Sequence, residues 1–222
     1  MKRLVITIDG PAGAGKTTAS RALADRLGYK YIDTGALYRA VAYEAMSRKI
    51  AADDDKALMK LCAALDLKFV FNKNDLRLFS GDFDITDRIR TPEITMLASA
   101  VSARAQVREY LLGLQRGLGK QKGVVVEGRD MGTVVFPDAD VKFFLDASRK
   151  VRVRRRYDQF KSTNTQKFKE VEKDLVRRDR NDSTRSLAPL KPAPDAILIN
   201  STDLSISEVV ELMLSYIKLR QG

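Results

Sequence analysis

The sequence contains no histidine and only one cysteine. The absence of histidine removes that side chain as a general base, as a metal ligand and as a switch near neutral pH. The one cysteine, Cys62, excludes an internal disulfide and gives no basis for a cysteine-ligated metal site, and its Ala/Leu-rich surroundings predict a small core residue. Catalysis would therefore depend on carboxylates, arginines, lysines and a bound metal ion, which are the groups that phosphoryl transfer uses.

Long hydrophobic runs are also absent. No apolar segment approaches the roughly 20 residues that a membrane-spanning helix requires, and the run after Met1-Lys2-Arg3 is too short for a signal peptide. We therefore expect a cytoplasmic protein without a membrane partner. Its 222 residues, 44% of them hydrophobic, suffice for one α/β domain with an insertion or for two small domains.

Basic residues exceed acidic ones by 11, which raises the possibility of nucleic-acid binding. The excess is local, because the segment from Arg149 to Arg185 holds 14 Lys or Arg and only 6 Asp or Glu. This concentration in one short segment favours a clamp for polyphosphate over a surface for duplex nucleic acid, although the counts alone do not decide between them.

The stretch from Gly10 to Thr17 reads Gly-Pro-Ala-Gly-Ala-Gly-Lys-Thr and matches the pattern G-x-x-x-x-G-K-[ST]. An apolar run at 4–8 with strand character precedes it, and a helical pattern at 18–27, stopped by Gly28, follows it. A strand, a glycine loop and a helix in this order indicate a phosphate-binding loop, because the loop N–H groups converge on phosphate oxygens at the positive end of a helix. The alternative, a glycine-rich turn that happens to carry a lysine, does not account for the flanking elements.

The loop therefore predicts a nucleoside triphosphate site. Lys16 would reach the β- and γ-phosphates, and the hydroxyl of Thr17 would be a ligand of Mg²⁺. The residues predicted to bind the nucleotide are Gly10, Pro11, Ala12, Gly13, Ala14, Gly15, Lys16, Thr17 and Thr18.

The rest of the chain alternates strand and helix patterns with one interruption. Strands are expected at 29–32, 123–126, 141–145 and 196–199, and helices after Asp33 and at 54–65, 93–118 (two), 149–179 (two) and 207–219. At 67–85 the period changes to short strands joined by turn residues at 72–75 and 81–82, which predicts an inserted antiparallel sheet. Five core strands alternating with helices imply a parallel sheet with right-handed crossovers.

Two polar segments follow predicted strands, at the sheet edge where parallel α/β proteins bind ligands. In the segment 33–39, Asp33 or Thr34 would cap a helix and Arg39 would offer a planar fork to a phosphate. Plain capping with a surface arginine explains the same spacing equally well. In the segment 127–130, Asp130 could accept from an exocyclic amine and Arg129 could bind a phosphate, while Glu127 would either assist Mg²⁺ or pair with an arginine.

Arginines cluster in the basic segment. Arg149, Arg152 and Arg156, with Arg155 beside them, share one helix face. A second cluster, Arg177, Arg178, Arg180 and Arg185, lies beyond a polar bend at 162–165. Two such helices could close over a nucleotide as a lid, although a solvated basic face would produce the same pattern.

Together these segments resemble the bacterial cytidylate kinases, a family of nucleoside monophosphate kinases. The resemblance rests on residues 8–16, 33–39, 127–139 and 185–190, which occur in the family's order over essentially the whole chain. It implies transfer of the γ-phosphoryl group of ATP to CMP or dCMP with Mg²⁺, in pyrimidine nucleotide metabolism. It also implies one P-loop kinase domain over residues 1–222, in which 66–90 form a small antiparallel β insertion for the monophosphate and 150–182 a short helical lid.

The resemblance further implies roles for individual residues. Thr34, Arg39 and Arg129 would hold the acceptor and its phosphate, and Asp33 would orient that phosphate or waters of Mg²⁺. Ser99, Arg108 and Asp130 would bind the cytosine, and Asp182 and Arg185 the sugar. The residues expected to act on the transferring phosphoryl group are Lys16, Arg39, Arg129 and the lid arginines Arg152, Arg156 and Arg178. The expected partners are ATP and CMP or dCMP, with no nucleic acid, and the protein is expected to be a monomer.

The chemistry of cytosine fits this assignment. Cytosine presents an amine donor beside two acceptors, so it needs a carboxylate next to arginine or hydroxyl donors, whereas uracil would place a carbonyl against Asp130 and be rejected. Two positions depart from the family pattern: Thr34 stands where serine is expected in many members, and Glu127 is aspartate in some relatives. Two other functions stay open at this point, namely a kinase for a different anionic small molecule and a regulatory NTPase that binds nucleic acid.

Overall fold

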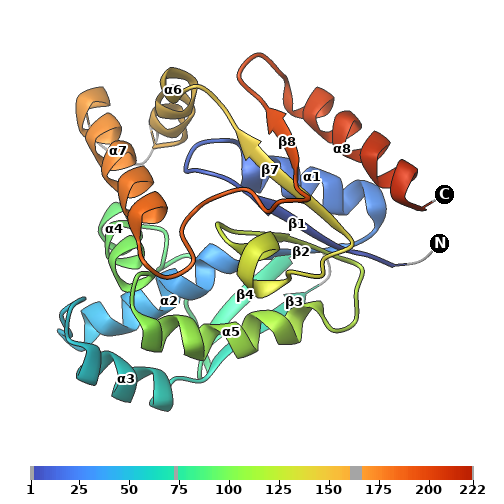
Figure 1. Cartoon of the computed structure of the whole chain (residues 1–222). Coiled ribbons are helices and arrows are strands. Elements are labelled where there is room, and N and C mark those ends of the chain that lie inside the picture. Colours follow the sequence, from blue (N-terminus) through green and yellow to red (C-terminus); the bar gives the residue numbers. More distant parts are fainter. Residues whose placement is uncertain (1–2, 73–74, 161–166, 222) are drawn as a thin grey trace. The chain divides into compact units, whose positions relative to one another are not determined.

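The structure is a computed structural model that describes residues 3–72, 75–160 and 167–221 (Figure 1). The polar bend predicted at 162–165 and the centre of the turn predicted at 72–75 lie outside these residues. The chain divides into two compact units. The first comprises Met1–Ile32, Gly119–Thr184 and Ala188–Gly222, and the second comprises Asp33–Leu118 and Arg185–Leu187.

A five-stranded sheet forms the centre of the first unit. Its strands, in spatial order, are β2 (Lys30–Asp33), β6 (Val124–Glu127), β1 (Val5–Asp9), β7 (Val141–Asp146) and β8 (Ile197–Asn200). The central strand β1 pairs in parallel with β6 and β7, and β7 pairs in parallel with β8. Every residue of β1 and β6 is buried, which explains why both strands read as unbroken runs rather than as an apolar/polar alternation.

The first unit has four α-helices and one π-helical turn among its described residues. They are α1 (Lys16–Leu27), the π-helix η1 (Met131–Val135), α6 (Arg149–Phe160), α7 (Phe168–Thr184) and α8 (Ile206–Gln221). The helices α1 and α8 pack together and against the sheet, and their side chains join one buried cluster that includes Leu23, Met213 and Phe143 (Figure 1). A separate small cluster of Ala12, Val153 and Leu175 joins the loop after β1 to α6 and α7.

The second unit combines helices with a small sheet. Its elements are α2 (Thr34–Ser47), α3 (Asp55–Ala64), β3 (Leu67–Asn72), β4 (Asp75–Ser80), β5 (Phe83–Asp84), α4 (Pro92–Val101) and α5 (Ala105–Gly119), the last of which ends one residue beyond the unit. The strands pair in antiparallel fashion in the order β3-β4-β5. One apolar core, with Leu37, Leu58 and Leu78 among its fully buried members, joins the sheet to the helices.

Local sequence signals account for most element boundaries. Asp33, rather than Thr34, caps α2 by accepting from the N–H of Ala36. Thr91 caps α4 with Pro92 in its first turn, as the Thr-Pro-Glu sequence predicts. The α/β fold with a parallel core sheet and an antiparallel insertion is therefore confirmed, and Cys62 is buried as expected. The domain boundaries at 66–90 and 150–182 stay predictions.

The sequence contains no signal for η1. Its residues, Met-Gly-Thr-Val-Val, are too few and too uniformly apolar to show a helical period. The turn begins where the backbone N–H groups of Met131 and Gly132 donate to the carboxylate of Asp9 on β1, so a contact distant in sequence determines its position. Within the part of the chain that the structure covers, none of the helices has the length and apolar character needed to cross a membrane.

Adjacent positions on α3 provide a test of the second unit's core. Leu58 is fully buried, whereas the side chain of Met59 is 55% exposed. Replacement of Leu58 by alanine should therefore lower the free energy of unfolding by about 2–5 kcal/mol, because it removes buried methyl groups and leaves a cavity. The matched Met59→Ala change should alter it by about 0.5 kcal/mol or less. Urea unfolding of both variants measures the difference, and equal losses would contradict the described packing.

Candidate active site

The loop between β1 and α1 has a backbone that only glycine permits. Gly10, Gly13 and Gly15 have φ angles of 144°, 77° and 92°, in the region that side chains disfavour. A Cβ atom on Gly10 would overlap the carbonyl oxygen of Leu145, and one on Gly13 would lie 2.6 Å from the carbonyl oxygen of Arg152. The loop therefore lies directly against β7 and α6, and the residue pattern reflects this close packing.

Lys16 starts α1 and folds back over the loop. Its Nζ donates to the carbonyl oxygen of Pro11 at 2.7 Å, and the residue is only 6% exposed. Burial, together with the positive charge of Arg129, lowers the pKa of Lys16 to about 7. An anion bound at the loop would restore the charged form, because a nearby negative charge stabilises the ammonium group.

Thr17 and Glu127 meet beside the loop. The hydroxyl of Thr17 donates to Oε1 of Glu127 at 2.8 Å, and the hydroxyl of Tyr31 donates to the same oxygen. Glu127 is buried, while Thr17 and Thr18 are exposed at the start of α1. A hydroxyl and a carboxylate are both hard oxygen donors of the kind that Mg²⁺ prefers. Among the residues described here, no group of three or more acidic, cysteine or histidine side chains is arranged to hold a metal ion.

Asp9 is a site residue that sequence reasoning missed. It ends β1, is 4% exposed, and accepts from the N–H groups of Met131 and Gly132 at 2.9 and 2.8 Å. It thereby anchors the backbone that immediately follows Arg129 and Asp130. The available signal was a carboxylate at the end of an otherwise apolar buried strand, since such a group needs a specific partner.

Burial raises the pKa of Asp9 to about 6, and the two backbone N–H groups offset only part of this effect. Lys16 also lowers this pKa, since its charge favours the carboxylate, whereas Asp130 raises it. The carboxylate of Asp9 is therefore a charged group held inside the unit at a net electrostatic cost.

Arg129 and Asp182 are brought together in the first unit. Nε of Arg129 donates to Oδ2 of Asp182 at 2.9 Å, and Nη1 donates to the carbonyl oxygen of Gly128. Burial opposes the charge of Arg129, but the carboxylates of Asp182, Glu127 and Asp179 together raise the pKa of the guanidinium overall. Two residues predicted to bind different parts of one nucleotide thus form a single ion pair between the segment after β6 and α7.

A second such pair lies in the second unit. Nη2 of Arg39 donates to Oδ2 of Asp33 at 2.6 Å. Burial alone would raise the pKa of Asp33, but Arg39 and the more remote Arg90 lower it overall. Nε of Arg39 is buried without a hydrogen-bond partner among the described residues, so the guanidinium retains an unused donor. Gly35 leaves room for the pair, because a Cβ there would lie 3.1 Å from both side chains.

Three other predicted substrate residues gather around the end of α4. Arg108 donates to the carbonyl oxygen of Ser102 at 3.1 Å, and Arg185 to its hydroxyl at 3.3 Å. The hydroxyl of Ser102 in turn donates to the carbonyl oxygen of Ser99. The hydroxyl of Ser99 is itself buried and has no partner among the described residues. These residues therefore form one polar cluster within the second unit, while Thr34 is buried in the first turn of α2.

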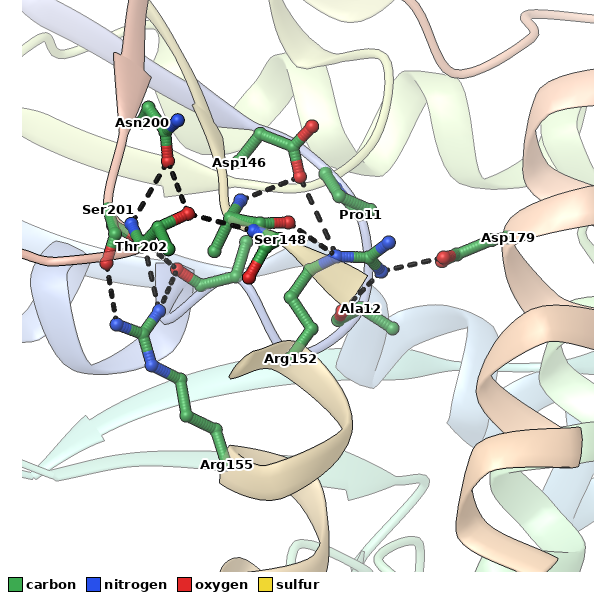
Figure 2. Close-up of polar contacts among 12 residues, drawn as sticks. Pro11, Ala12, Asp146, Ser148, Arg152, Arg155, Asp179, Asn200, Ser201 and Thr202 are labelled. Carbon is green, nitrogen blue, oxygen red and sulfur yellow. Dashed lines mark hydrogen bonds and ion pairs between the residues drawn. The ribbon is translucent and has the colours of Figure 1, made fainter. Parts of the chain in front are cut away.

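The three predicted lid arginines have different surroundings. Arg152 is only 8% exposed and donates to the carbonyl oxygens of Ala12 and Ala147 and to Oδ2 of Asp179 (Figure 2). Arg156 donates to Gln159 on its own helix, and Arg178 is half-buried on α7, where its charge acts on Lys16. Arg152 is thus held against the phosphate loop.

A glycine loop of this geometry on a parallel sheet is typical of the P-loop kinases, and solved structures agree at the level of the fold. Shikimate kinase from Bacteroides thetaiotaomicron is similar with a TM-score of 0.52 at 14% identity, covering 98% of this chain and 99% of that chain. The family model "Cytidylate kinase" matches residues 6–219. The chain belongs to the cytidylate kinase family.

Curated relatives over nearly the full length are each called cytidylate kinase. The protein of Geobacter sulfurreducens is 52% identical over 98% of this chain and 94% of its own length. That of Methylococcus capsulatus is 47% identical over 96% of both chains. That of Halalkalibacterium halodurans is 43% identical over 99% of this chain and all of its own. The resemblance recognised in the sequence is thereby confirmed.

The position of Asp9 makes a pH-dependent contribution to stability that can be measured. Because the pKa of Asp9 is raised from 3.8 to about 6 on folding, its stabilising effect is present below pH 4 and is lost as the pH rises through 6. Over that range the wild type should lose about 3 kcal/mol relative to an Asp9→Asn variant, which cannot ionise. Urea unfolding of both proteins from pH 4 to pH 7 provides the comparison. A difference between them that stays constant with pH would be the contrary result.

Proposed function

We propose that the protein transfers the γ-phosphoryl group of ATP to CMP, and to dCMP, yielding ADP and the corresponding diphosphate for pyrimidine nucleotide metabolism. One observation carries the proposal: the match to the cytidylate kinase family extends over almost the whole chain and includes both the phosphate loop and the 127–139 segment. The proposal also states that the protein is a cytoplasmic monomer and that it acts on free nucleotides.

The donor would bind at the loop between β1 and α1. The loop N–H groups and the ammonium group of Lys16 would stabilise the negative charge that spreads over the transferring group. The lowered pKa of Lys16 supports this role, since burial makes its ammonium form costly and a bound phosphate would stabilise that form.

Mg²⁺ fits the donor set beside the loop. Thr17 would supply a hydroxyl ligand, and Glu127 would accept hydrogen bonds from the metal's waters. Few protein ligands are expected, because Mg²⁺ in such sites keeps several waters and takes the rest of its ligands from phosphates. When bound, the ion would neutralise charge on the β- and γ-phosphates.

Each unit holds residues that the family resemblance assigns to the acceptor. In the second unit, Arg39 would hold the acceptor phosphate. Ser99 and Arg108 would bind the cytosine, and Arg185 the sugar. Among the described residues, neither Nε of Arg39 nor the hydroxyl of Ser99 has a hydrogen-bond partner. This supports the assignment, because buried polar atoms usually have one. Asp33 would keep Arg39 in orientation, and Thr34 would contribute its hydroxyl.

In the first unit, Arg129 would bind the acceptor phosphate, Asp130 would accept from the cytosine amine, and Asp182 would bind the sugar. The hydrogen bonds of Asp9 support this, since they restrain the backbone directly after Asp130. Arg152, Arg156 and Arg178 would neutralise charge during transfer. No covalent intermediate is needed, because the phosphate dianion of CMP is already a nucleophile.

The alternative functions have distinct signatures. A kinase for another anionic small molecule would release ADP with that acceptor and not with CMP. A regulatory NTPase that binds nucleic acid would show steeply salt-dependent RNA or DNA binding that survives alanine at Arg39 and Asp130. Both are weaker than the main proposal, because neither accounts for the specific match of the 127–139 segment.

A panel of nucleoside monophosphates tests the proposal. ADP release with ATP, Mg²⁺ and CMP, dCMP, UMP or AMP should be fastest with a cytosine nucleotide. Asp130→Ala should lower kcat/KM for CMP by about 100-fold, because it leaves the cytosine amine without its charged acceptor. The exposed Asp138, in the same segment, provides the control, and Asp138→Ala should leave the rate unchanged. Turnover with UMP or AMP but not with CMP would reject the assignment of the base.

Substitution of Arg39 should weaken the binding of CMP and not that of ATP. Arg39→Lys keeps the positive charge but removes the planar fork that can bind Asp33 and a phosphate at once. We expect KM for CMP to rise by about 10-fold or more with little change in KM for ATP. The control is Arg48→Lys, because Arg48 is exposed and lies at the C-terminal end of the same helix. A rise confined to KM for ATP would place Arg39 at the donor instead.

A further inference from the structure

Two peptide groups of the phosphate loop are held from outside by arginines of α6. The carbonyl oxygen of Ala12 accepts from Nη1 of Arg152 at 3.0 Å, and that of Ala14 accepts from Nη1 of Arg155 at 3.4 Å (Figure 2). Both arginines reach the loop from the same helix, which also packs on it through Val153 and Ala12. Arg155 has no role in the function proposed above.

Ser201, directly after β8, completes the contact at Ala14. Its hydroxyl donates to the Ala14 carbonyl oxygen at 3.1 Å and accepts from Nη1 of Arg155 at 2.9 Å, while its own carbonyl oxygen accepts from Nη2 at 2.7 Å. Its N–H donates to the carbonyl oxygen of Asp146 on β7 at 2.7 Å, and the residue is 2% exposed. The pair of Arg155 and Ser201 therefore connects the Ala14 carbonyl to the end of the sheet.

The direction of a carbonyl determines the direction of the next amide. In a trans peptide the C=O and N–H bonds point to opposite sides, so holding the carbonyl of Ala14 directs the N–H of Gly15 the other way. Gly15 has a φ of 92°, and glycine crosses between positive and negative φ with little penalty, so this peptide could otherwise rotate. The same reasoning applies to the carbonyl of Ala12 and the N–H of Gly13.

We propose that Arg155 and Ser201 are a positioning pair that keeps the Gly15 N–H directed toward the phosphates of the donor nucleotide. The proposal rests on the loop being the site of the ATP phosphates, and it is independent of CMP being the acceptor. Arg155 acts through the backbone and does not itself contact the nucleotide. Arginine suits this position because its two Nη atoms bind two acceptors at once, which a lysine cannot do in the same geometry.

Binding of inorganic tripolyphosphate and of ATP, measured by calorimetry, tests the pair without any phosphoryl transfer. We expect Arg155→Lys and Ser201→Ala each to weaken both ligands by about 5- to 10-fold, as loss of one orienting hydrogen bond should. The double variant should be hardly weaker than either single one, because both changes release the same peptide. Arg154→Lys on the exposed face of α6 is the matched control and should bind like the wild type.

A purely electrostatic effect of Arg155 would behave differently. Arg155→Lys would then bind like the wild type, Ser201→Ala would have no effect, and only Arg155→Ala would weaken tripolyphosphate; that pattern overturns the proposal. Additive losses in the double variant would also overturn it. Kinetics separates a general structural role from a positioning role. The Arg155→Lys and Ser201→Ala variants should raise KM for ATP, while KM for CMP and the urea midpoint stay near wild-type values.

The outcomes also separate this proposal from the proposed function. One outcome is that the wild type binds tripolyphosphate and both variants bind it more weakly, but the wild type does not phosphorylate CMP. That outcome would refute the proposed kinase function and support the positioning pair. A wild type that phosphorylates CMP, with variants that bind as well as it does, would refute the pair alone. A wild type that binds neither ATP nor tripolyphosphate would refute both.

Discussion

The close approach of the phosphate loop to β7 and α6 is the constraint on which the rest of the first unit depends. At Gly10 and Gly13 the neighbouring backbone occupies the space that a side chain would need. This contact brings the loop carbonyls within reach of the α6 arginines. The loop backbone is therefore packed against β7 and held by hydrogen bonds from side chains of α6.

In each of the two units, partly buried arginines are paired with carboxylates. Arg129 pairs with Asp182, Arg39 with Asp33, and Arg152 with Asp179. Burying an arginine without a partner costs free energy, and a carboxylate that accepts its hydrogen bonds offsets this cost. An anionic ligand can then compete for some of the arginine's N–H donors. A protein whose substrates are all polyanions needs many positive groups, and pairing them with carboxylates lets the protein fold without the ligand.

Much of the fold could be predicted because its signals are local. The apolar runs of β1 and β6, the Asp33 and Thr91 caps and the Gly28 stop each depend on a few neighbouring residues. The π-helix at Met131 and the role of Asp9 could not, because each depends on the other across 122 residues of chain. The sequence identifies Arg155 only as one of several arginines on a helix face, because nothing nearby in sequence distinguishes it from the exposed Arg154.

The sequence by itself determined the parallel sheet, the phosphate loop, the antiparallel insertion and the family, because these follow from periodicity, turn residues and an ordered set of motifs. Only the tertiary structure decided what each charged side chain contacts. It placed Arg152 and Arg155 on loop carbonyls, Asp182 on Arg129, and Asp9 beneath the segment that carries Asp130. The reason is physical: hydrogen bonds and ion pairs are short-ranged and directional, so a partner is defined by position in space, which a one-dimensional pattern does not contain.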